Sequence, residues 1–209
     1  MSAAAGRSAP WDVASALGWA AGFVGAEVTP GAGSTLDLWD ALATLAAQDV
    51  ALARAVEPQW DALAILHQAG APASGGTWGV FAAEGGDHPL TAASDGDRWM
   101  LSGVKPWCSL AGSLDRALVT AHVGDGRRLF AVDLHDPGVT VEPSAWVARG
   151  LTEIPSGPVR FAAVPAIPVG PTGWYLRRRG FELGGIGVAA CWWGGAVGIA
   201  QHVHAAAAA

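Results

Sequence analysis

The sequence is poor in cysteine and in charge. Its 209 residues include two cysteines, Cys108 and Cys191, which lie far apart and have no metal-binding neighbours in sequence. Such a pattern gives neither a disulfide framework nor a zinc site, and we expect a reducing, cytoplasmic setting. Charged residues make up 14% of the chain, against about 25% in an average globular protein. Much of the chain is therefore expected to be buried or covered by a partner.

Lysine is almost absent. Lys105 is the single lysine among twelve basic residues, and the formal net charge is -6. The basic residues form no cluster apart from the triplet at 177–179, so nucleic acid is not an expected ligand. An arginine triplet can meet a phosphate, but a solvated charged turn before a helix is the more frequent case and is our prediction here.

A convincing targeting signal is also lacking. The N-terminal apolar stretch carries a lone Arg7 and is interrupted by Asp12, which predicts a protein that is not exported. Residues 183–200 form an uncharged run of eighteen, the lower edge of the roughly 17–25 residues that span a bilayer. Six of the eighteen are glycine, and Gly194 and Gly198 form a GxxxG pattern. We predict a helix that packs closely on another helix, and no membrane span.

Tryptophan is abundant, with eleven residues. Tryptophan is typical of cores, interfaces and ligand walls, so its abundance is compatible with a buried planar ligand. The first 70 residues have helical spacing and predict three helices. These follow Trp11, Ser34 or Thr35, and Pro58, and the third ends at the breaker sequence 70–72. We assign residues 1–74 to an N-terminal helical domain.

From Gly75 onward the pattern changes to short runs rich in Val, Phe and Trp, separated by turn dipeptides. Turns at such close intervals predict an antiparallel β-barrel or sandwich, because parallel strands need long crossovers. This middle β-domain is assigned to residues 75–170, with Pro165 and Pro168 marking its exit. The predicted strands are 78–83, 98–102, 116–123, 127–134, 139–142 and 157–164.

The last segment, 171–209, is predicted to be the start of a C-terminal helical bundle. Residues 181–209 are helix-like and end in alanines without a Gly, Asn or Pro cap, so we expect the chain to end inside a helix. The fold class is therefore α+β: an N-terminal helical segment, an antiparallel barrel or sandwich, and the beginning of a helical bundle.

Three motifs, in this order along roughly residues 36–204, resemble the acyl-CoA dehydrogenase family. The sequence WGVFAAEGG at 78–86 is similar to the family's aliphatic pair followed by Thr-Glu-Pro. WMLSGVKPWCS at 99–109 is similar to its strand, Gly-x-Lys turn and Trp-x-Thr/Ser pattern. LFAVDL at 129–134, PGV at 137–139, VRF at 159–161 and VP at 164–165 resemble its later β-strands. The resemblance implies a flavoprotein that binds FAD.

The resemblance also implies which residues hold the flavin. Trp107 would shield the isoalloxazine ring and Ser109 would bond near its N5 atom. Two residues that are two apart on a strand share a face, which suits this pair. Cys108 lies between them, without a neighbouring base to form a thiolate. Backbone N–H groups would reach the pyrimidine end. The predicted cofactor-binding set is Phe81, Ala82, Ala83, Glu84, Trp107, Cys108 and Ser109.

The chain departs from the family pattern in the first motif. Ala83 stands where the family has Thr, and Gly85 stands where it has Pro. The Gly-Ser-Asp that follows in the family, its usual contact to thioester and pantetheine, is replaced by Gly-Asp-His at 86–88. The backbone at 82–84 still offers its donors, since these do not depend on side-chain identity.

The family reaction is α,β-dehydrogenation of an acyl-CoA, in which a glutamate of the C-terminal helical domain removes the α-proton. Glu153 and Glu182 occupy other positions, so we expect the base beyond Ala209 and no catalytic residue or metal ligand within this chain. The isolated chain is expected to lack dehydrogenase activity and to hold flavin weakly, if at all. The expected partners are acyl-CoA, an electron-transfer protein and further copies of the full-length chain.

Two alternatives remain open. One is a non-catalytic binding or assembly module whose segment 183–200 is covered by a partner. The other is a flavin-dependent monooxygenase of the same fold, since fold does not decide chemistry. The G-x-G-x-x-A pattern at 185–190 follows no predicted strand and is not expected to bind a dinucleotide. His202 and His204 would point to different sides of a helix, so they are not expected to bind metal.

Overall fold

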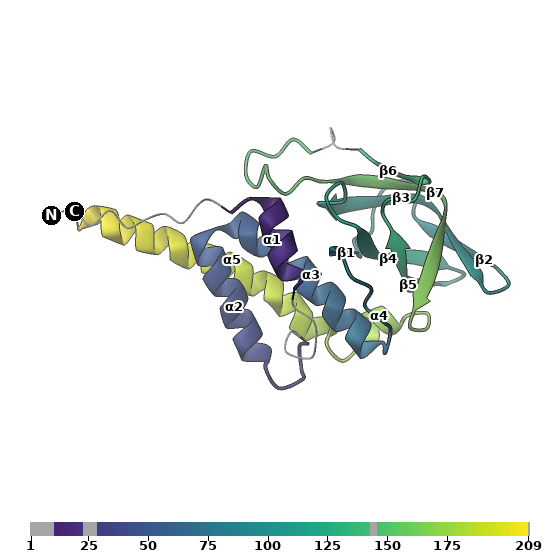
Figure 1. Ribbon diagram of the computed structural model, residues 1–209, viewed down its shortest axis with the longest axis horizontal. Helices are drawn as coiled ribbons and strands as arrows, with labels where there is room; N and C mark the ends of the chain where they lie inside the picture. The colour runs from purple at the N-terminus through teal and green to yellow at the C-terminus, as the bar shows by residue number, and fades with distance from the viewer. Residues whose placement is uncertain (1–10, 23–28, 143–145, 209) are drawn as a thin grey trace.

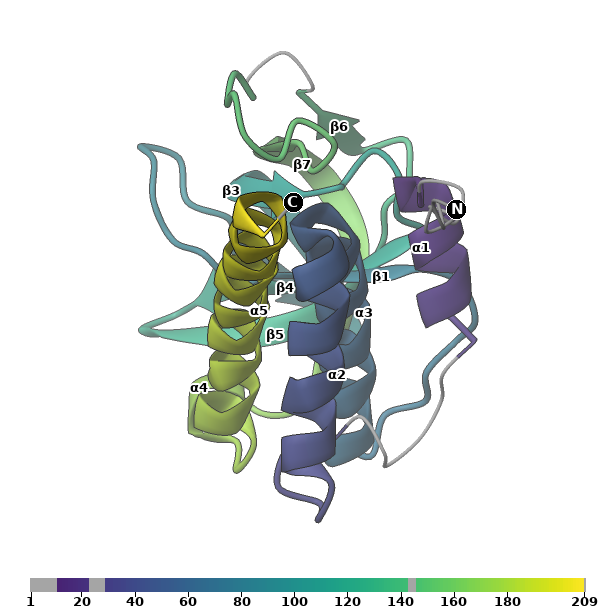
Figure 2. The ribbon, with the colours of Figure 1, turned by 90° about the vertical axis from the view of Figure 1, so that its left-hand side faces the viewer.

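The computed structural model describes residues 11–22, 29–142 and 146–208 and consists of a helical layer beside a β-barrel (Figure 1). Figure 2 shows the helices α2, α3 and α5 side by side in front of the strands. The elements in chain order are α1 (Val13–Ala20), α2 (Thr35–Gln48), α3 (Val50–Gln68), β1 (Trp78–Phe81), β2 (Thr91–Asp95), β3 (Arg98–Ser109), β4 (Arg116–Val123), β5 (Gly126–Asp133), β6 (Val139–Val141), β7 (Ser156–Val169), α4 (Trp174–Arg177) and α5 (Phe181–Ala207).

Five strands close into a barrel in the order β4-β2-β3-β7-β5, because β4 also pairs with β5. Most neighbours are antiparallel, and β6 adds to β7 outside the ring. The predicted α+β class with an antiparallel barrel is confirmed. Among the described residues, two pairings between named strands are parallel: β1 lies along β4 from Trp78↔Arg116 to Phe81↔Val119, and β2 touches β4 at Thr91↔His122. The β2–β3 hairpin lies within the long crossover that joins β1 to β4.

Pro165 and Pro168 do not end the sheet, contrary to the sequence prediction. They lie inside β7, opposite Met100 of β3 and Phe130 of β5. The pairing partner of β7 changes here from β3 to β5, since Ala166 pairs with β3 and Ile167 pairs with β5. A proline has no N–H to give to a ladder, and a site where strand pairing changes is one of the few that tolerate it.

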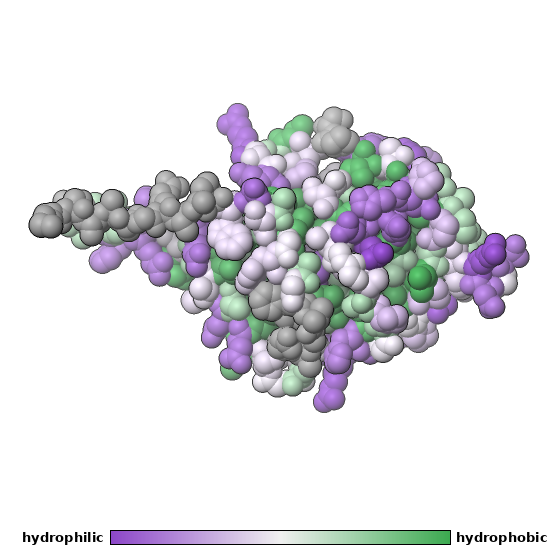
Figure 3. Space-filling model, viewed as in Figure 1, coloured by the Kyte–Doolittle hydropathy of each residue, from purple (hydrophilic) through white to green (hydrophobic). Residues whose placement is uncertain are grey.

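The strand β2 was missed by the sequence analysis. Its sequence TAASD lacks large apolar residues, and almost all of it is exposed, so no period-two pattern marks it. In Figure 3 hydrophilic side chains gather at the tip of the β2–β3 hairpin, on the right of the view. The strand forms through its register with β3, from Thr91↔Ser102 to Asp95↔Arg98.

The third helix begins at Val50 rather than after Pro58, so that prediction is wrong. Asp49 ends α2 and caps α3, accepting a hydrogen bond of 2.8 Å from the backbone N–H of Ala51. A side-chain oxygen at this position replaces a missing helical acceptor and favours helix initiation. Pro58 lies inside the helix. Because proline has no N–H, the carbonyl of Arg54 lacks its helical donor.

The hydrophobic core continues from the barrel interior into the helical layer. Inside the barrel, Leu101, Val119 and Phe130 are fully buried. Val56 and Trp60 of α3 are buried in the same cluster as these three residues. This shared core holds the helices against the open edge of β1, which is where the candidate site lies.

The helices α5 and α2 are in very close contact. A Cβ atom added at Gly194 would collide with the backbone of Ala43, and one at Gly198 would collide with the backbone of Ala47. The GxxxG prediction of close helix packing is therefore confirmed.

The rest of α5 is largely exposed, including Trp192 and Trp193. Among the described residues α5 is the helix with enough length and apolarity to cross a membrane, a test that core helices also pass. Its assignment as a non-spanning helix stays a prediction.

The first prediction concerns the close contact of Gly194 on α5 with α2. We expect Gly194→Ala to destabilise the fold by about 1–3 kcal/mol, because the added methyl group must displace the α2 backbone. The gain in helix propensity, at most about 1 kcal/mol, does not offset this. Gly185→Ala on the same helix is the matched control, since a Cβ there meets nothing within 4 Å. Urea unfolding measures both, and equal stability of the two variants would contradict the close contact.

Candidate functional site

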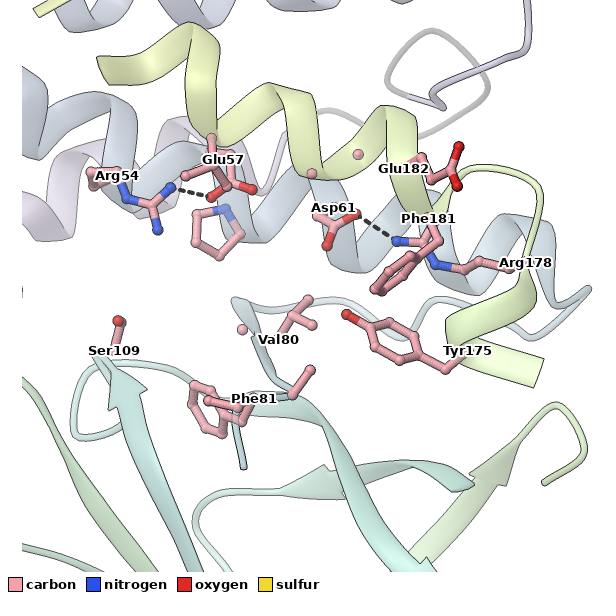
Figure 4. A pocket seen from close by; sticks show the side chains of 17 residues that line it. Arg54, Glu57, Asp61, Val80, Phe81, Ser109, Tyr175, Arg178, Phe181 and Glu182 are labelled. Atoms are coloured by element: carbon pink, nitrogen blue, oxygen red, sulfur yellow. Dashed lines mark hydrogen bonds and ion pairs between the residues drawn. The ribbon is translucent and has the colours of Figure 1, made fainter. Parts of the chain in front are cut away.

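A cavity of about 410 Å³ lies between the helical layer and the barrel. Figure 4 shows its two walls. The helical wall consists of side chains from α3 and the beginning of α5, with Tyr175 of α4 and Arg178 between them. The barrel wall consists of β1, the loop that follows it and the end of β3. The volume lies within the roughly 300–1,000 Å³ of ligand pockets. We call this space the site cavity.

The structure brings together the two segments that the sequence predicted to bind flavin. Ala82, Ala83 and Ser109 line the site cavity together. The loop after β1 and the end of β3 also touch, because a Cβ at Gly85 would lie 3.5 Å from the Trp107 ring. The register of β1 with β4 ends at Phe81. The backbone of residues 82–84 therefore lies past the end of the strand.

Glu84 does not face the cavity but fixes the loop to the barrel. Its carboxylate lies 2.8 Å from the Lys105 ammonium group, 2.9 Å from His122 and 3.1 Å from Arg127. Lys105 is 2% exposed and also donates to the Thr120 hydroxyl at 2.8 Å. Burial raises the pKa of Glu84, but the hydrogen bonds and charge of these partners outweigh it and lower the pKa to about 2. Glu84 is therefore ionised, and its backbone alone is left for a ligand.

Trp107 has a strained backbone and an exposed side chain. Its φ is +52°, a left-handed conformation that a bulky residue rarely adopts. It lies in a β-bulge, where the β3–β7 register shifts between Lys105 and Cys108. The side chain is 61% exposed, although tryptophan is usually buried. Strain at a bulge that aims an aromatic ring outward is typical of ligand walls.

Cys108 and Phe81 have buried side chains. The Cys108 thiol donates to the carbonyl of Lys105 at 3.3 Å, and burial raises its pKa to about 12. A thiol with this pKa is not a nucleophile at neutral pH. Its side chain belongs to the core, so a contact from this position to a cofactor would come from the backbone. Phe81 is 3% exposed but still contributes to the cavity wall.

Ser109 is held in one orientation by a second serine. Its hydroxyl lies 2.7 Å from the hydroxyl of Ser156, which donates to the carbonyl of Ile154 at 3.1 Å. Because Ser156 gives its proton to Ile154, Ser109 must donate to Ser156. The Ser109 oxygen keeps its acceptor capacity on the cavity side, where it can receive an N–H.

The helical wall carries two ion pairs that the sequence analysis did not find. Arg54 and Glu57 of α3 are 2.7 Å apart, and Asp61 of α3 lies 3.2 Å from Arg178 (Figure 4). Burial is the main cause that raises the pKa of Glu57, to about 7, against the lowering effect of Arg54. Burial likewise raises the pKa of Asp61, opposed by Arg178. Residues 54, 57 and 61 share one helical face, a pattern that was hidden when Pro58 was taken as the helix start.

Arg178 is not in a solvated turn, so the prediction for the arginine triplet is wrong at this position. Its side chain is 2% exposed and donates to Gln68 at 2.9 Å as well as to Asp61. It lies over the rings of Tyr175 and Phe181, at 5.4 and 5.9 Å from their centroids. Its buried Nε atom has no acceptor among the described residues. Flat guanidinium groups stack on aromatic rings in this way, which explains the burial.

A second cavity, of about 910 Å³, is lined mainly by apolar residues, including Trp78, Trp99 and Pro168. None of the seven predicted cofactor-binding residues lines it. Among residues 11–22, 29–142 and 146–208, no group of three or more His, Cys, Asp or Glu side chains could hold a metal ion.

The second prediction concerns Glu84. We expect Glu84→Gln to destabilise the fold by about 2 kcal/mol, less than for a fully buried pair, because Lys105 loses its counter-charge while Glu84 is partly solvated. The folded pKa lies below the ordinary value of 4.5. The stabilisation is thus present above pH 4.5 and lost as the pH falls towards 2. Thermal unfolding from pH 7 to pH 2.5 should show the wild type approaching the variant.

Glu142→Gln is the matched control for this prediction, since Glu142 forms an exposed pair with Arg160 at 3.5 Å. Its expected effect is below about 1 kcal/mol at every pH. A gap between wild type and Glu84→Gln that stayed constant down to pH 2.5 would contradict the role assigned to the carboxylate.

Comparison with known proteins gives matches in structure alone. No protein-family model matches the chain, and no curated protein matches its sequence. TdsC from Paenibacillus sp. A11-2, solved with FMN and indole, is 21% identical with a TM-score of 0.65, covering 78% of this chain and 48% of that one. KijD3, solved with FMN and dTDP-3-amino-2,3,6-trideoxy-4-keto-3-methyl-D-glucose, is 19% identical with a TM-score of 0.64, covering 90% and 51%.

A third similar structure is Tcur3481–Tcur3483, a steroid ACAD. It is 26% identical with a TM-score of 0.62, and the match covers 80% of this chain and 49% of that one. The chain spans about half the length of the solved chains it matches. It has the acyl-CoA dehydrogenase-type fold, which flavin-dependent enzymes among these neighbours share.

Proposed function

We propose that this chain is the flavin-binding part of a flavin-dependent oxidoreductase whose substrate occupies the site cavity. One observation carries the proposal. The residues expected at a flavin, Ala82, Ala83 and Ser109, form one wall of a cavity whose other wall holds buried acid–base groups. Buried titratable groups with shifted pKa values are typical of catalytic sites.

The residues present suit a flavin ring. The backbone of Ala82 and Ala83 offers donors past the end of β1, the Ser109 oxygen offers an acceptor, and Trp107 offers a large exposed aromatic surface beside them. The bound flavin would supply two-electron redox chemistry. The chain's own part is to bind the ring, to orient it through Ser109 and to exclude water with Trp107. We propose FAD, with FMN as the alternative since both TdsC and KijD3 were solved with FMN.

Two kinds of reaction fit this arrangement. The α,β-dehydrogenation of an acyl-CoA is supported by the likeness to a steroid ACAD. Oxidation or oxygenation of a smaller polar compound is supported by the two partly buried ion pairs of the cavity, because a hydrocarbon chain gains nothing from charged walls. TdsC and KijD3, solved with nitrogen-containing ligands, favour the second reaction. An electron-transfer partner and self-association stay part of the proposal in either case.

The third prediction tests flavin binding directly. We propose that the purified chain binds FMN or FAD weakly but saturably, seen as quenching of flavin fluorescence with rising protein concentration, and that Trp107→Ala weakens this binding by about tenfold. Loss of one stacked aromatic surface costs roughly 0.5–1.5 kcal/mol, to which the loss of buried ring area adds. Flavin fluorescence titration gives the dissociation constants for both cofactors.

Trp193→Ala is the matched control for Trp107→Ala. Trp193 is 64% exposed, close to the 61% of Trp107, but lies on α5 away from the barrel wall. It should bind flavin as the wild type does. Absence of saturable binding for both FMN and FAD would overturn the proposed function, and equal weakening by the two variants would remove Trp107 from the site.

A further inference from the structure

The helical wall of the site cavity is unusually rich in charge for a chain with so few charged residues. The cavity is lined by Glu57, Asp61 and Glu182 and by two guanidinium groups, those of Arg54 and Arg178. We propose that this wall binds an amine-bearing substrate and that the Glu57 carboxylate accepts a proton from the substrate's ammonium group. The inference rests on the proposed function, because it names the substrate class of the same site.

Negative charge is in excess on this wall when all its groups are ionised. Three carboxylates face two guanidinium groups, and the guanidiniums are paired with two of the carboxylates, Arg54 with Glu57 and Arg178 with Asp61. A ligand that compensates this excess needs a positive charge and hydrogen-bond donors for the carboxylates. An ammonium group brings three donors together with a compensating positive charge.

A hydrocarbon ligand would fit this wall poorly. It would remove water from the two ion pairs without replacing any hydrogen bond, and buried charges are costly to leave uncompensated. The apolar part of a substrate can contact the side chains of Phe81, Val80 and Val188, which also line the cavity. The cavity thus combines an apolar half with a charged half in which carboxylates are in excess, as expected for a small amine with a ring or short chain.

Glu57 is the group best placed to receive the proton. It is 7% exposed, and one of its carboxylate oxygens, Oε2, is 2.7 Å from Arg54. Its pKa, raised to about 7 mainly by burial, puts the change of charge near neutral pH, where a proton acceptor works best. The titratable and charged groups that influence or neighbour Glu57 are Arg54 and Asp61 on α3, Tyr175 and Arg178 after the barrel, and Glu182 and Cys191 on α5.

The proton transfer balances without any further reagent. The N–H bond of the ammonium group breaks, an O–H bond forms on the Glu57 carboxylate, and the electron pair stays on nitrogen. The neutral amine that results has a free lone pair, which an ammonium ion lacks. This is the form of an amine that can be oxidised.

The fourth prediction uses cyclohexylamine as the probe and cyclohexanol as its uncharged counterpart. An alkylamine stays protonated from pH 6 to pH 8, since its pKa resembles the roughly 10.4 of lysine. Glu57 becomes ionised over the same range, so the wild type should bind cyclohexylamine up to about tenfold more tightly at pH 8 than at pH 6. Calorimetric titration of the full chain measures both probes, and cyclohexanol should show no such dependence.

Glu57→Gln keeps the shape of the side chain and removes its titration, so this variant should bind cyclohexylamine with no change between pH 6 and pH 8. Glu153→Gln, a substitution outside the cavity, should behave as the wild type. If Glu57→Gln does not fold, proton release by the wild type tests the same role of Glu57. At pH 7 the binding of the amine should release roughly half a proton, seen as a buffer-dependent binding enthalpy.

Equal affinity for amine and alcohol, or a pH dependence that persists in folded Glu57→Gln, would overturn the inference, and so would binding without proton release. These measurements need no flavin and are therefore separable from the flavin titration. Flavin binding without amine binding would leave the proposed function standing and remove the substrate class. Amine binding without flavin binding would overturn the proposed flavin-dependent function and leave the amine site standing.

Discussion

The ion pair between Lys105 and Glu84 is the interaction on which the barrel wall of the site depends. Lys105 is 2% exposed and lies 2.8 Å from the carboxylate of Glu84, in the loop after β1, where residue 84 itself pairs with no strand. Burying the Lys105 ammonium group without a counter-charge would destabilise the fold, so Glu84 and the loop that carries it are held beside Lys105. The same strand then bulges, which turns Trp107 outward and brings Ser109 to the cavity. One buried cation thereby positions both segments expected to contact a flavin.

The opposite wall depends on a corresponding constraint. Arg178 comes directly after α4, and its contacts with Asp61 and Gln68 tie this segment to α3. Since α5 begins three residues later, the pair also fixes where that helix starts, while Gly194 and Gly198 fix how closely it approaches α2. The cavity is the space left between two rigid layers, each anchored by a buried arginine or lysine. In a chain with few charges, those that are buried decide the geometry.

The sequence predicted the features that depend on local pattern. The bounds of β4 agree with the predicted 116–123, and the order of helices, barrel and final helix was correct, because alternating apolar residues and turn dipeptides mark buried strands. It did not predict β2, whose pairing with β3 replaces any apolar signal, or the start of α3, because a proline tolerated inside a helix resembles a proline at its beginning. In the candidate site, the residues of the barrel wall were predicted from the resemblance of their motifs to the acyl-CoA dehydrogenase family. Asp61 and Arg178 were missed because 117 residues separate them. Arg54 and Glu57 were missed because they precede Pro58, which was taken as the start of the helix.

The missed residues are the ones that bear most directly on chemistry. A barrel wall that holds a flavin is shared by dehydrogenation and oxygenation, because the ring serves either reaction. The choice between them must come from what faces the ring. Here the helical wall of the site cavity holds paired charges and a glutamate whose pKa is raised to about 7, and this glutamate precedes the Pro58 at which the sequence predicted the helix to begin. In the proposed reaction Glu57 on α3 would accept the proton, a role that the family resemblance assigns to a glutamate beyond Ala209. It follows that the reaction can be decided by residues that precede the flavin motifs, in the part of the chain that carries no recognisable motif of its own.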